Sequence, residues 1–534
     1  MEILVLIEKN SAYVRHVYRQ KRCATVMLSE MEDTMDSVWS KTCEIEKREA
    51  LPGDIEREVV VIGAGMAGIL IANALQKSGR EVVVLEAERI ASGQTRNTTA
   101  KITSQHGFIY SGLIDTLGEE KARQYAAANQ KAILEYKAMV QEREIDCDFE
   151  ETDAYVYAQE ESVLKKEAEA AASLGLPASF MQKPELTFPN AGAVKFTNQA
   201  QFHPLKFLRA ITEKLEIYED TRVLKVEEQT AGKAAEYTAG YASAEDREKE
   251  QVVSTNRGIV RAKKVVFACH YPFVNFPGMY FTRMHQERSY VLALENAARV
   301  DGMYIGEGEI TYSLRNYGDL LIFGGGNHRT GENREGGRYQ ALRDKAAELF
   351  PGCREVACWS AQDCITPDNV PYIGRYASGK PDWYVATGFH KWGMSSSMVS
   401  AMILRDLICG IENPFAEVFA PDRLDGQDIS GIMCEGAHAV KGLTKRFFQL
   451  PAETASELAK GSGGIVMLEG EKVGVYKDED GKLYAVDVRC PHLGCQLEWN
   501  PDELSWDCPC HGSRFDRFGK LISNPAQEDV NRYA

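Results

Sequence analysis

The chain has 534 residues, of which 44% are hydrophobic and 26% charged, a composition typical of soluble globular proteins. Its length predicts about three folding units. Its 62 basic and 78 acidic residues give a net charge of −16, which argues against binding to nucleic acid or to an anionic membrane surface.

Residues 1–54 are predicted to be an N-terminal extension, because they are charged and precede the first clear strand. We expect no core to begin before about residue 55. The opening apolar run, Met1–Glu8, is too short for the core of a signal peptide and has no basic leader. No other apolar run reaches the roughly 18 residues that cross a bilayer. We therefore expect no transmembrane segment and a cytoplasmic protein.

The first regular pattern is a strand–helix–strand unit. Val59–Ile62 is an apolar, β-branched run typical of a strand buried on both faces. Met66–Ser78 has the apolar spacing of a helix and is followed by Gly79, a common helix end. Val82–Leu85 is the next strand. Units of this kind build parallel sheets.

The turn of this unit reads Gly63-Ala64-Gly65-Met66-Ala67-Gly68, a GxGxxG motif. The motif alone is a weak signal, but here it follows a strand, opens a helix and has Glu86 at the end of the second strand. Gly63 permits the tight turn, Gly65 lets the backbone approach a pyrophosphate, and Gly68 lets the helix pack on the strand. Glu86 would accept hydrogen bonds from an adenosine ribose. The pattern predicts a dinucleotide site; a glycine-rich turn without a ligand is the alternative.

The middle of the chain mixes helices and strands. Its predicted elements are the helices Glu119–Ile145 and Glu161–Ser173 and the strands Arg222–Glu227, Lys264–Cys269 and Leu320–Phe323. A segment Asp368–Gly374 then precedes the strand Trp383–Thr387, the stretch Gly388–Met394 and a helix over Ser395–Cys409.

The order of these segments resembles the D-amino-acid oxidase (glycine/sarcosine oxidase-like) family of FAD enzymes, over about residues 55–425. The resemblance implies that Ser92 and Gly93 lie by the flavin phosphates and that Val223 lines the adenine. It also implies that Gly388–Met394 brings a helix N-terminus to the flavin pyrimidine, where the helix dipole stabilises the anionic reduced flavin. Asn97 stands where some relatives tether FAD through a histidine, so we expect non-covalent FAD.

The predicted FAD site comprises Gly63, Ala64, Gly65, Met66, Ala67, Gly68, Glu86, Ala87, Ser92, Gly93, Thr95, Val223, Gly388, Gly393 and Met394. No catalytic residue is assigned. Arg315 and His328 flank the strand that leads into three consecutive glycines, Gly324–Gly326, and are the candidates for binding the substrate. A structural role fits each of them at least as well.

Residues 426–463 are predicted to be a linker, and residues 464–534 a small all-β domain with strands at Val473–Tyr476 and Leu483–Val488. Four of the 13 cysteines crowd into this domain, whereas the other nine are scattered in the manner of reduced thiols packed as small hydrophobes.

The cysteine cluster reads Cys490-Pro491-His492-Leu493-Gly494-Cys495 and then Cys508-Pro509-Cys510-His511-Gly512-Ser513. Each string offers one thiolate and one imidazole, at Cys490 and His492 and at Cys508 and His511. Two cysteines and two histidines match a Rieske [2Fe-2S] centre, in which His₂ replaces Cys₂ on one iron. A Cys₂His₂ zinc site needs the same ligands, but its usual spacing differs and two cysteines are then left over.

Those two cysteines, Cys495 and Cys510, resemble the disulfide pair of the Rieske proteins of cytochrome bc1 and b6f complexes. The resemblance runs from about Gly464 to the end of the chain. It implies a disulfide between the two ligand loops, an exception to the rarity of disulfides in the cytoplasm.

The predicted fold is an α/β FAD-binding Rossmann-type domain with an interleaved α+β substrate domain, followed by an all-β Rieske domain. The predicted function is oxidation of a small amine or amino acid by FAD, with electrons leaving through the cluster to an external acceptor resembling a ferredoxin, a flavodoxin or a quinone. The alternatives are a reductase that runs this path in reverse, an oxidase that uses O₂, and a non-enzymatic redox sensor or electron carrier.

Overall fold

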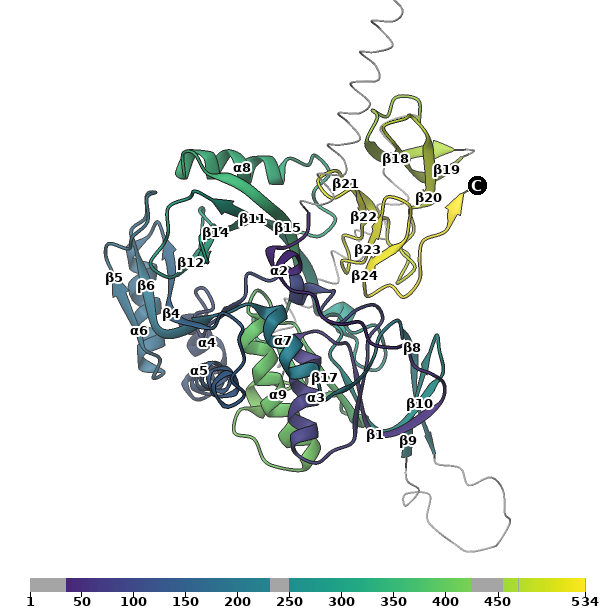
Figure 1. The fold of residues 1–534 in the computed structure, drawn as a ribbon, viewed down its shortest axis with the longest axis horizontal. Coiled ribbons are helices and arrows are strands. Elements are labelled where there is room, and N and C mark those ends of the chain that lie inside the picture. Colours follow the sequence, from purple (N-terminus) through teal and green to yellow (C-terminus); the bar gives the residue numbers. More distant parts are fainter. Residues whose placement is uncertain (1–34, 231–248, 424–454, 469, 534) are drawn as a thin grey trace, which may run out of the picture.

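Two large sheets carry most of the chain, and two four-stranded sheets form its C-terminal end (Figure 1). This computed structural model describes residues 35–230, 249–423, 455–468 and 470–533. The predicted extension and linker lie partly outside the described residues, and the predicted domain boundaries remain predictions. Within the described ranges, no helix is long and apolar enough to cross a membrane.

Sheet A has eight strands. Its continuous order is β16 (Tyr372–Ala377), β17 (Lys380–Thr387), β10 (Ile259–Phe267), β1 (Ile55–Ile62), β2 (Val82–Leu85) and β7 (Glu216–Tyr218), with β9 (Lys249–Thr255) and β8 (Val223–Thr230) joined through β10. The five strands from β17 to β7 are parallel. The last four residues of β1 and all of β2 are buried, as the β-branched runs predict, because apolar clusters cover both faces of the sheet.

Sheet B has nine strands. Its order is β15 (Arg354–Ile365), β11 (His285–Glu295), β14 (Leu320–Arg329), β13 (Ser313–Tyr317), β12 (Met303–Gly306), β4 (Glu150–Ala158), β6 (Gly192–Gln201) and β3 (Lys101–Ile102), and β5 (Ala178–Met181) pairs with β6. The chain enters sheet B several times between visits to sheet A, which confirms the prediction of two interleaved units.

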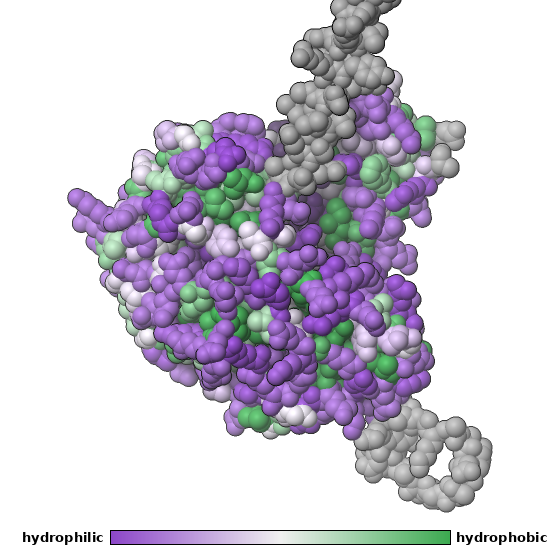
Figure 2. Space-filling view, in the orientation of Figure 1, coloured by the Kyte–Doolittle hydropathy of each residue, from purple (hydrophilic) through white to green (hydrophobic). Residues whose placement is uncertain are grey.

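Helices α3 (Met66–Lys77) and α9 (Gly393–Cys409) pack against each other beside sheet A (Figure 1). The other helices of the described ranges are α2 (Val38–Thr42), α4 (Tyr110–Leu117), α5 (Glu119–Glu142), α6 (Glu161–Ser173), α7 (Pro204–Thr212), α8 (Arg338–Leu349) and α10 (Ala416–Phe419), with short 3₁₀ turns η1 (Gln94–Asn97) and η2 (Tyr280–Thr282). Figure 2 shows hydrophilic residues over most of the visible face, in keeping with the high content of charged residues.

The core begins earlier than the sequence predicts. Trp39, in α2, is fully buried and belongs to the main apolar cluster of the molecule. Its indole N–H donates to the Thr98 carbonyl at 2.7 Å, and its ring meets those of His203 and Tyr317 edge-on. A helix of five residues carries too short a pattern to be recognised, so the expectation that no core begins before about residue 55 is wrong from α2 onward.

The C-terminal domain is all-β, as predicted. Its first sheet joins β18 (Ser462–Leu468), β19 (Glu471–Lys477), β20 (Leu483–Asp487) and β25 (Arg532–Tyr533), and its second joins β21 (Glu498–Asn500), β22 (Ser505–Asp507), β23 (Arg514–Asp516) and β24 (Leu521–Ser523). Figure 1 shows this domain beside β11 and β15 of sheet B.

Candidate functional site

A cavity of about 280 Å³ lies at the ends of the parallel strands of sheet A. Its walls come from three parts of the chain: the GxGxxG turn and the loops after β2, β10 and β17; the end of β15 in sheet B; and the segment 522–527 of the C-terminal domain. Ligands of open parallel sheets bind at this edge, where the loops diverge.

The glycines of the motif shape the first wall of the cavity. Gly63 has φ +105°, and a Cβ there would lie 2.6 Å from the Ala268 carbonyl oxygen. A Cβ at Gly68 would collide with the Gly63 carbonyl, so Gly68 allows α3 to approach β1. Gly65 is the N-cap of α3 and lines the cavity. The close approaches at Gly63 and Gly68 leave no room for a side chain, whereas the approach of a pyrophosphate to Gly65 stays a prediction.

Glu86 holds the turn from the end of β2. Its Oε2 accepts a hydrogen bond from the Ala64 N–H at 2.7 Å, and its Oε1 accepts one from the Glu88 N–H at 3.0 Å. Burial raises the pKa of its carboxyl, while the two backbone donors act in the opposite direction. Thr95 contributes from the next loop, because its Oγ1 accepts from the Met66 N–H at 2.9 Å.

A second helix also begins at the cavity. Helix α9 starts at Gly393 without a side-chain cap, and Gly388, Gly393 and Met394 all line the cavity. The N-termini of α3 and α9 therefore both border it, and each carries a partial positive charge. This arrangement fits FAD, whose pyrophosphate and reduced flavin ring are both anionic.

Most of the predicted FAD residues share this cavity. All of them line it except Ala64 and Gly68, which support the turn from behind. Asn97 does not line it; its carbonyl accepts a hydrogen bond from the Trp359 indole at 2.9 Å.

The sequence did not predict several cavity-lining residues that lie outside the GxGxxG unit and the Gly388–Met394 stretch. Among these lining residues are His270, Gln362, Asp363, Asn524 and Gln527. The pairing of sheet B brings Gln362 and Asp363 here, and the docking of the C-terminal domain brings Asn524 and Gln527. His270 lies in the loop after β10, where no motif marks it.

Neither substrate-site candidate reaches the cavity. The guanidinium of Arg315 is buried and donates to the carbonyls of Thr99 and Ala100 at 2.9 and 2.8 Å. The Nε2 of His328 lies 3.0 Å from the Tyr290 hydroxyl oxygen. Both side chains are occupied in structural contacts, so the structure does not support them as substrate ligands.

Two acidic residues stand opposite each other on neighbouring strands of sheet B. Glu287 in β11 pairs in register with Asp363 in β15, and Asp363 lines the cavity together with Lys391. Burial raises the pKa of Asp363 to about 7, with Lys391 opposing the shift. The pKa of Glu287 is lowered, chiefly by its hydrogen bond with His285. Like charges directly opposite destabilise a sheet, so this pair is an unusual feature of the cavity wall.

The predicted metal ligands lie on two facing loops of the C-terminal domain. In each loop a glycine N–H donates back to a cysteine carbonyl at 2.9 Å, from Gly494 to Cys490 and from Gly512 to Cys508. The two thiols of Cys490 and Cys508 hydrogen-bond each other, which raises the pKa of Cys490 and lowers that of Cys508.

The two histidines of these loops complete a four-ligand set. The rings of His492 and His511 lie 4.9 Å apart between centroids. The Nε2 of His492 lies 2.8 Å from Oδ1 of Asn275, and its Nδ1 is buried without a hydrogen-bond partner among the described residues. If Nε2 carries the proton, Nδ1 has a lone pair for a metal. Two thiols and two imidazoles, of which all but the half-buried His492 are buried, fit a [2Fe-2S] cluster with His₂ on one iron.

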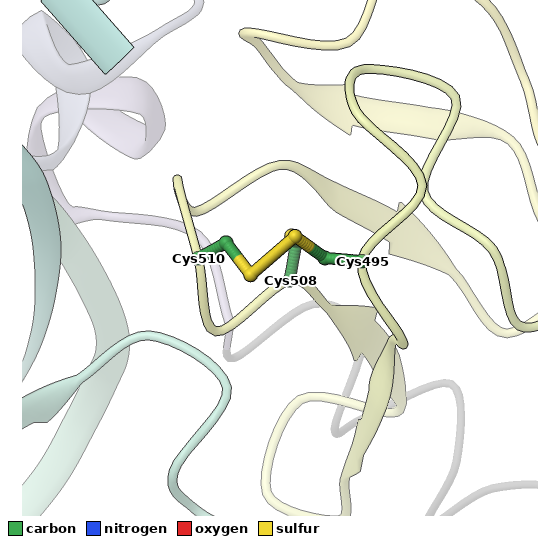
Figure 3. Close-up of side chains that lie close together, drawn as sticks. All are labelled: Cys495, Cys508 and Cys510. Atoms are coloured by element: carbon green, nitrogen blue, oxygen red, sulfur yellow. A yellow bond between two sulfur atoms is a disulfide. The ribbon is translucent and has the colours of Figure 1, made fainter. Parts of the chain in front are cut away.

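Figure 3 shows the sulfur atoms close to this set. Those of Cys495, Cys508 and Cys510 lie within 4.8 Å of one another. Cys495 and Cys510 are joined in the disulfide that the resemblance implied, so of these three only Cys508 keeps a thiol for a metal. The disulfide links the two ligand loops.

The C-terminal domain is docked against the cavity. The amide of Asn524 donates to the carbonyls of Cys269 and Tyr271, at 2.8 and 2.6 Å, and Asn524 itself lines the cavity. Farther along the interface, the buried Arg288 of β11 pairs with the buried Glu503, which also contacts Arg514 at 3.1 Å.

Comparison with known proteins places both parts of the chain. The family model described as FAD dependent oxidoreductase matches residues 58–407, and the model described as Rieske [2Fe-2S] domain matches residues 449–534. A Rieske 2Fe-2S iron-sulfur protein of Bacillus subtilis strain 168, YhfW, is 35% identical over 511 residues, which cover 93% of this chain and 97% of that protein. The cytochrome b6-f complex iron-sulfur subunit 1 of Cyanophora paradoxa is 31% identical over 121 residues, 22% of this chain and 48% of the subunit.

Two solved structures share the fold of the larger part. Glycine oxidase from Geobacillus kaustophilus aligns with a TM-score of 0.56 and 19% identity, over 70% of this chain and 100% of that one. L-proline dehydrogenase from P. horikoshii aligns with a TM-score of 0.55 and 20% identity, over 70% of this chain and 98% of that one. With the family match over residues 58–407, these findings establish that the chain belongs to the FAD dependent oxidoreductase family and carries a C-terminal Rieske [2Fe-2S] domain.

Proposed function

We propose that the protein is a dehydrogenase that oxidises a small amine or amino acid at FAD and passes the electrons through its Rieske cluster to an external acceptor. One observation carries this proposal: the Rieske domain lines the same cavity as the GxGxxG turn, through Ile522, Ser523, Asn524 and Gln527. A domain docked for stability alone has no need to form a wall of the flavin site.

The two cofactors have complementary capacities. FAD accepts two electrons as a hydride from a substrate C–H bond, and a [2Fe-2S] cluster carries one electron at a time. The amine becomes an imine and loses a proton to solvent. Two one-electron transfers then reach an acceptor of the ferredoxin, flavodoxin or quinone class.

The proposed FAD ligands are the predicted residues, with Ala64 and Gly68 supporting the turn rather than lining it. FAD binds without a covalent link, because the side chain at the tether position is an asparagine, Asn97. The proposed ligands of the cluster are Cys490, His492, Cys508 and His511. Among these, His492 has the best support for a metal-binding role. Its Nε2 lies within hydrogen-bonding distance of Asn275 Oδ1, and its Nδ1 is buried without a hydrogen-bond partner among the described residues.

Two side chains of the cavity wall support an amine or amino acid as substrate. Asp363 and Lys391 both line the cavity, and burial raises the pKa of the Asp363 carboxyl to about 7. The Lys391 ammonium can pair with a substrate carboxylate, and the Asp363 carboxyl can hydrogen-bond to a substrate amine. The solved structures with this fold include a glycine oxidase and an L-proline dehydrogenase, whose names give amino acids as their substrates.

A substrate screen under anaerobic conditions tests the proposal. Amines and amino acids are added singly, and bleaching of the oxidised flavin is followed by its absorbance. A true substrate bleaches the flavin and also produces the EPR signal of a reduced Rieske cluster. In His511→Ala the flavin is still expected to bleach, whereas reduction of a one-electron dye that draws on the cluster is lost.

The other outcomes separate the alternatives. Rapid flavin reoxidation by O₂ that is unaffected by His511→Ala indicates an oxidase. Bleaching by a reduced carrier protein, but by no amine, indicates a reductase. No turnover with any compound, together with a partner that binds only one redox state, indicates a sensor.

A further inference from the structure

Two buried glutamines stand between the flavin cavity and the second ligand loop of the cluster. Gln286 lies in β11 and Gln362 in β15, on adjacent antiparallel strands of sheet B. Their exposed fractions are 1% and 0%. Buried amide groups are costly unless they are hydrogen-bonded, so the partners of these side chains indicate what they do.

Both amides donate to the backbone of the ligand loop. The Nε2 of Gln286 donates to the His511 carbonyl at 2.6 Å, and the Nε2 of Gln362 donates to the Gly512 carbonyl at 2.8 Å. The two side chains also hydrogen-bond each other, from Gln362 Nε2 to Gln286 Oε1. The two side chains thus form one hydrogen-bonded pair that binds two consecutive carbonyls of the loop, those of His511 and Gly512. His511 is a proposed ligand of the cluster.

The same unit borders the flavin cavity. Gln362 lines the cavity directly. Gln286 reaches it through His270, whose Nε2 lies 3.1 Å from Gln286 Oε1 and which is itself a lining residue. At this point only one layer of side chains, which contains Gln286 and Gln362, separates the cavity from the second ligand loop.

The contact leaves no space for a side chain on the loop. Gly512 has φ +80°, and a Cβ there would lie 2.6 Å from the Cβ of Gln286. In the FAD-binding part of the chain, Gly331 has φ +79°, and a Cβ there would lie 2.6 Å from the Pro509 nitrogen. Glycine on each side of the contact lets backbone approach side chain, so the loop is held tightly against sheet B.

We propose that Gln286 and Gln362 are positioning residues that fix the cluster loop against the wall of the flavin cavity, and that electrons cross between the two cofactors at this contact. The proposal rests on the proposed function only in that electrons pass from FAD to the cluster within this chain. The step makes and breaks no covalent bond: the reduced flavin loses one electron, and one ferric ion of the cluster becomes ferrous. The external one-electron acceptor reoxidises the cluster before the second electron follows.

The arrangement explains why the wall is polar. Electron transfer slows steeply as the separation of two redox groups grows, so a loosely docked loop makes the transfer slow and variable. Two neutral amides hold the loop by directed hydrogen bonds and add no charge that either redox group must accommodate. Apolar residues in their place would fill the space but leave the His511 and Gly512 carbonyls without these donors.

The test compares the double variant Gln286→Met/Gln362→Met with the intact protein and with Asn333→Leu. Methionine keeps the length of glutamine but cannot donate these hydrogen bonds. Asn333 is a matched control, because it is buried in the same interface and donates to Asn500 and Asp502 at 3.0 and 2.8 Å, away from the ligand loops.

Holoprotein is reduced by a light flash in the presence of deazaflavin, without substrate, and the absorbance of flavin and cluster is followed. We expect the rate of electron equilibration to fall at least about tenfold in the double variant, the effect of about 1.4 kcal/mol lost from two hydrogen bonds. The rate in Asn333→Leu stays at that of the intact protein. Hydrogen–deuterium exchange in residues 508–513 becomes faster in the double variant alone, while the EPR spectrum and melting temperature match the control.

Two results overturn the proposal: an unchanged rate in the double variant, or an equal slowing in Asn333→Leu. Should the double variant lack a cofactor, the single variant Gln362→Glu replaces it, because it keeps the size of the side chain but turns a donor toward Gly512 into an acceptor. A normal rate in Gln362→Glu also overturns the proposal. Since no substrate is used, failure of the amine screen leaves this test intact, and slow transfer here leaves flavin bleaching by a substrate intact.

Discussion

The Nε2 atom of His492 in the Rieske domain lies 2.8 Å from the Oδ1 atom of Asn275 in the FAD-binding part of the chain. A histidine that binds iron through Nδ1 commonly donates its other N–H to an oxygen, and this partner fixes the tautomer and tunes the metal. Here the partner comes from outside the Rieske domain. With His492 as the proposed ligand, the docked FAD-binding part of the chain would supply part of the environment of the cluster.

Replacing Asn275 by leucine is expected to raise the midpoint potential of the cluster. An acceptor on Nε2–H makes the imidazole a better donor to iron and stabilises the ferric state, so its loss favours reduction. A hydrogen bond contributes about 0.5–1.5 kcal/mol, and about 1.4 kcal/mol corresponds to about 59 mV for one electron, so the rise is some tens of millivolts. Redox titration followed by EPR measures it, with Asn333→Leu as control. An unchanged or lower potential contradicts the expectation.

Trp39→Ala is expected to destabilise the protein by about 3–5 kcal/mol, the usual cost of removing a buried tryptophan. The indole is fully buried, its N–H donates to the Thr98 carbonyl, and the Arg315 guanidinium lies over its ring.

Deletion of residues 1–30, which lie outside the described residues, is expected to leave FAD content and melting temperature unchanged. Thermal melting of the two proteins, side by side, checks their stability, and the FAD released on denaturation checks the cofactor content of the deletion variant. A neutral Trp39→Ala shows that α2 does not contribute to the stability of the core.

Comparison of the β1–α3–β2 unit with helix α2 shows which parts of the fold the sequence could predict. The β1–α3–β2 unit was predictable because its signal is local: β-branched runs, a glycine motif and an acidic residue at fixed spacing. The ligand strings of the Rieske domain are equally local. Helix α2 was missed because five residues carry no periodicity, and only its contacts with distant segments make it core.

The cavity walls from sheet B and the Rieske domain were missed for a related reason. Asp363 and Gln362 lie near the end of strand β15, and nothing nearby in the sequence marks them. They become part of the site only when β15 pairs with β11 and the C-terminal domain docks. Arg315 was chosen because it precedes a glycine run, yet its guanidinium donates to backbone carbonyls that no sequence pattern places.

The buried pair of Arg288 and Glu503 yields a third prediction. Despite their burial, Arg288 and Arg514 lower the pKa of Glu503 to about 2. Arg288→Leu alone leaves a buried carboxylate with only one of its two cations, and breaking such a pair costs about 3–5 kcal/mol. The double variant Arg288→Leu/Glu503→Leu is expected to recover part of this loss, because Arg514 keeps Asp507 as a partner at 3.0 Å. Melting temperatures of the three proteins test it; equal values for the single and double variants contradict it.

The carboxyl of Asp363 provides a pH-dependent prediction with a definite sign. Its pKa is raised by burial from 3.8 to about 7, with Glu287 adding to the shift and Lys391 opposing it. The folded protein therefore holds this proton up to about pH 7, whereas the unfolded chain releases it near pH 4. A group that binds its proton more tightly in the folded state makes stability fall as pH rises through this window.

Asp363→Asn removes the titration but keeps the shape of the side chain. Relative to the wild type, the variant is expected to gain in melting temperature between pH 5 and pH 8, and not below pH 4. The exposed Asp344→Asn on α8 controls for effects of pH on the rest of the protein. If the difference between Asp363→Asn and the wild type is the same at pH 5 and pH 8, Asp363 does not hold its proton in the folded state.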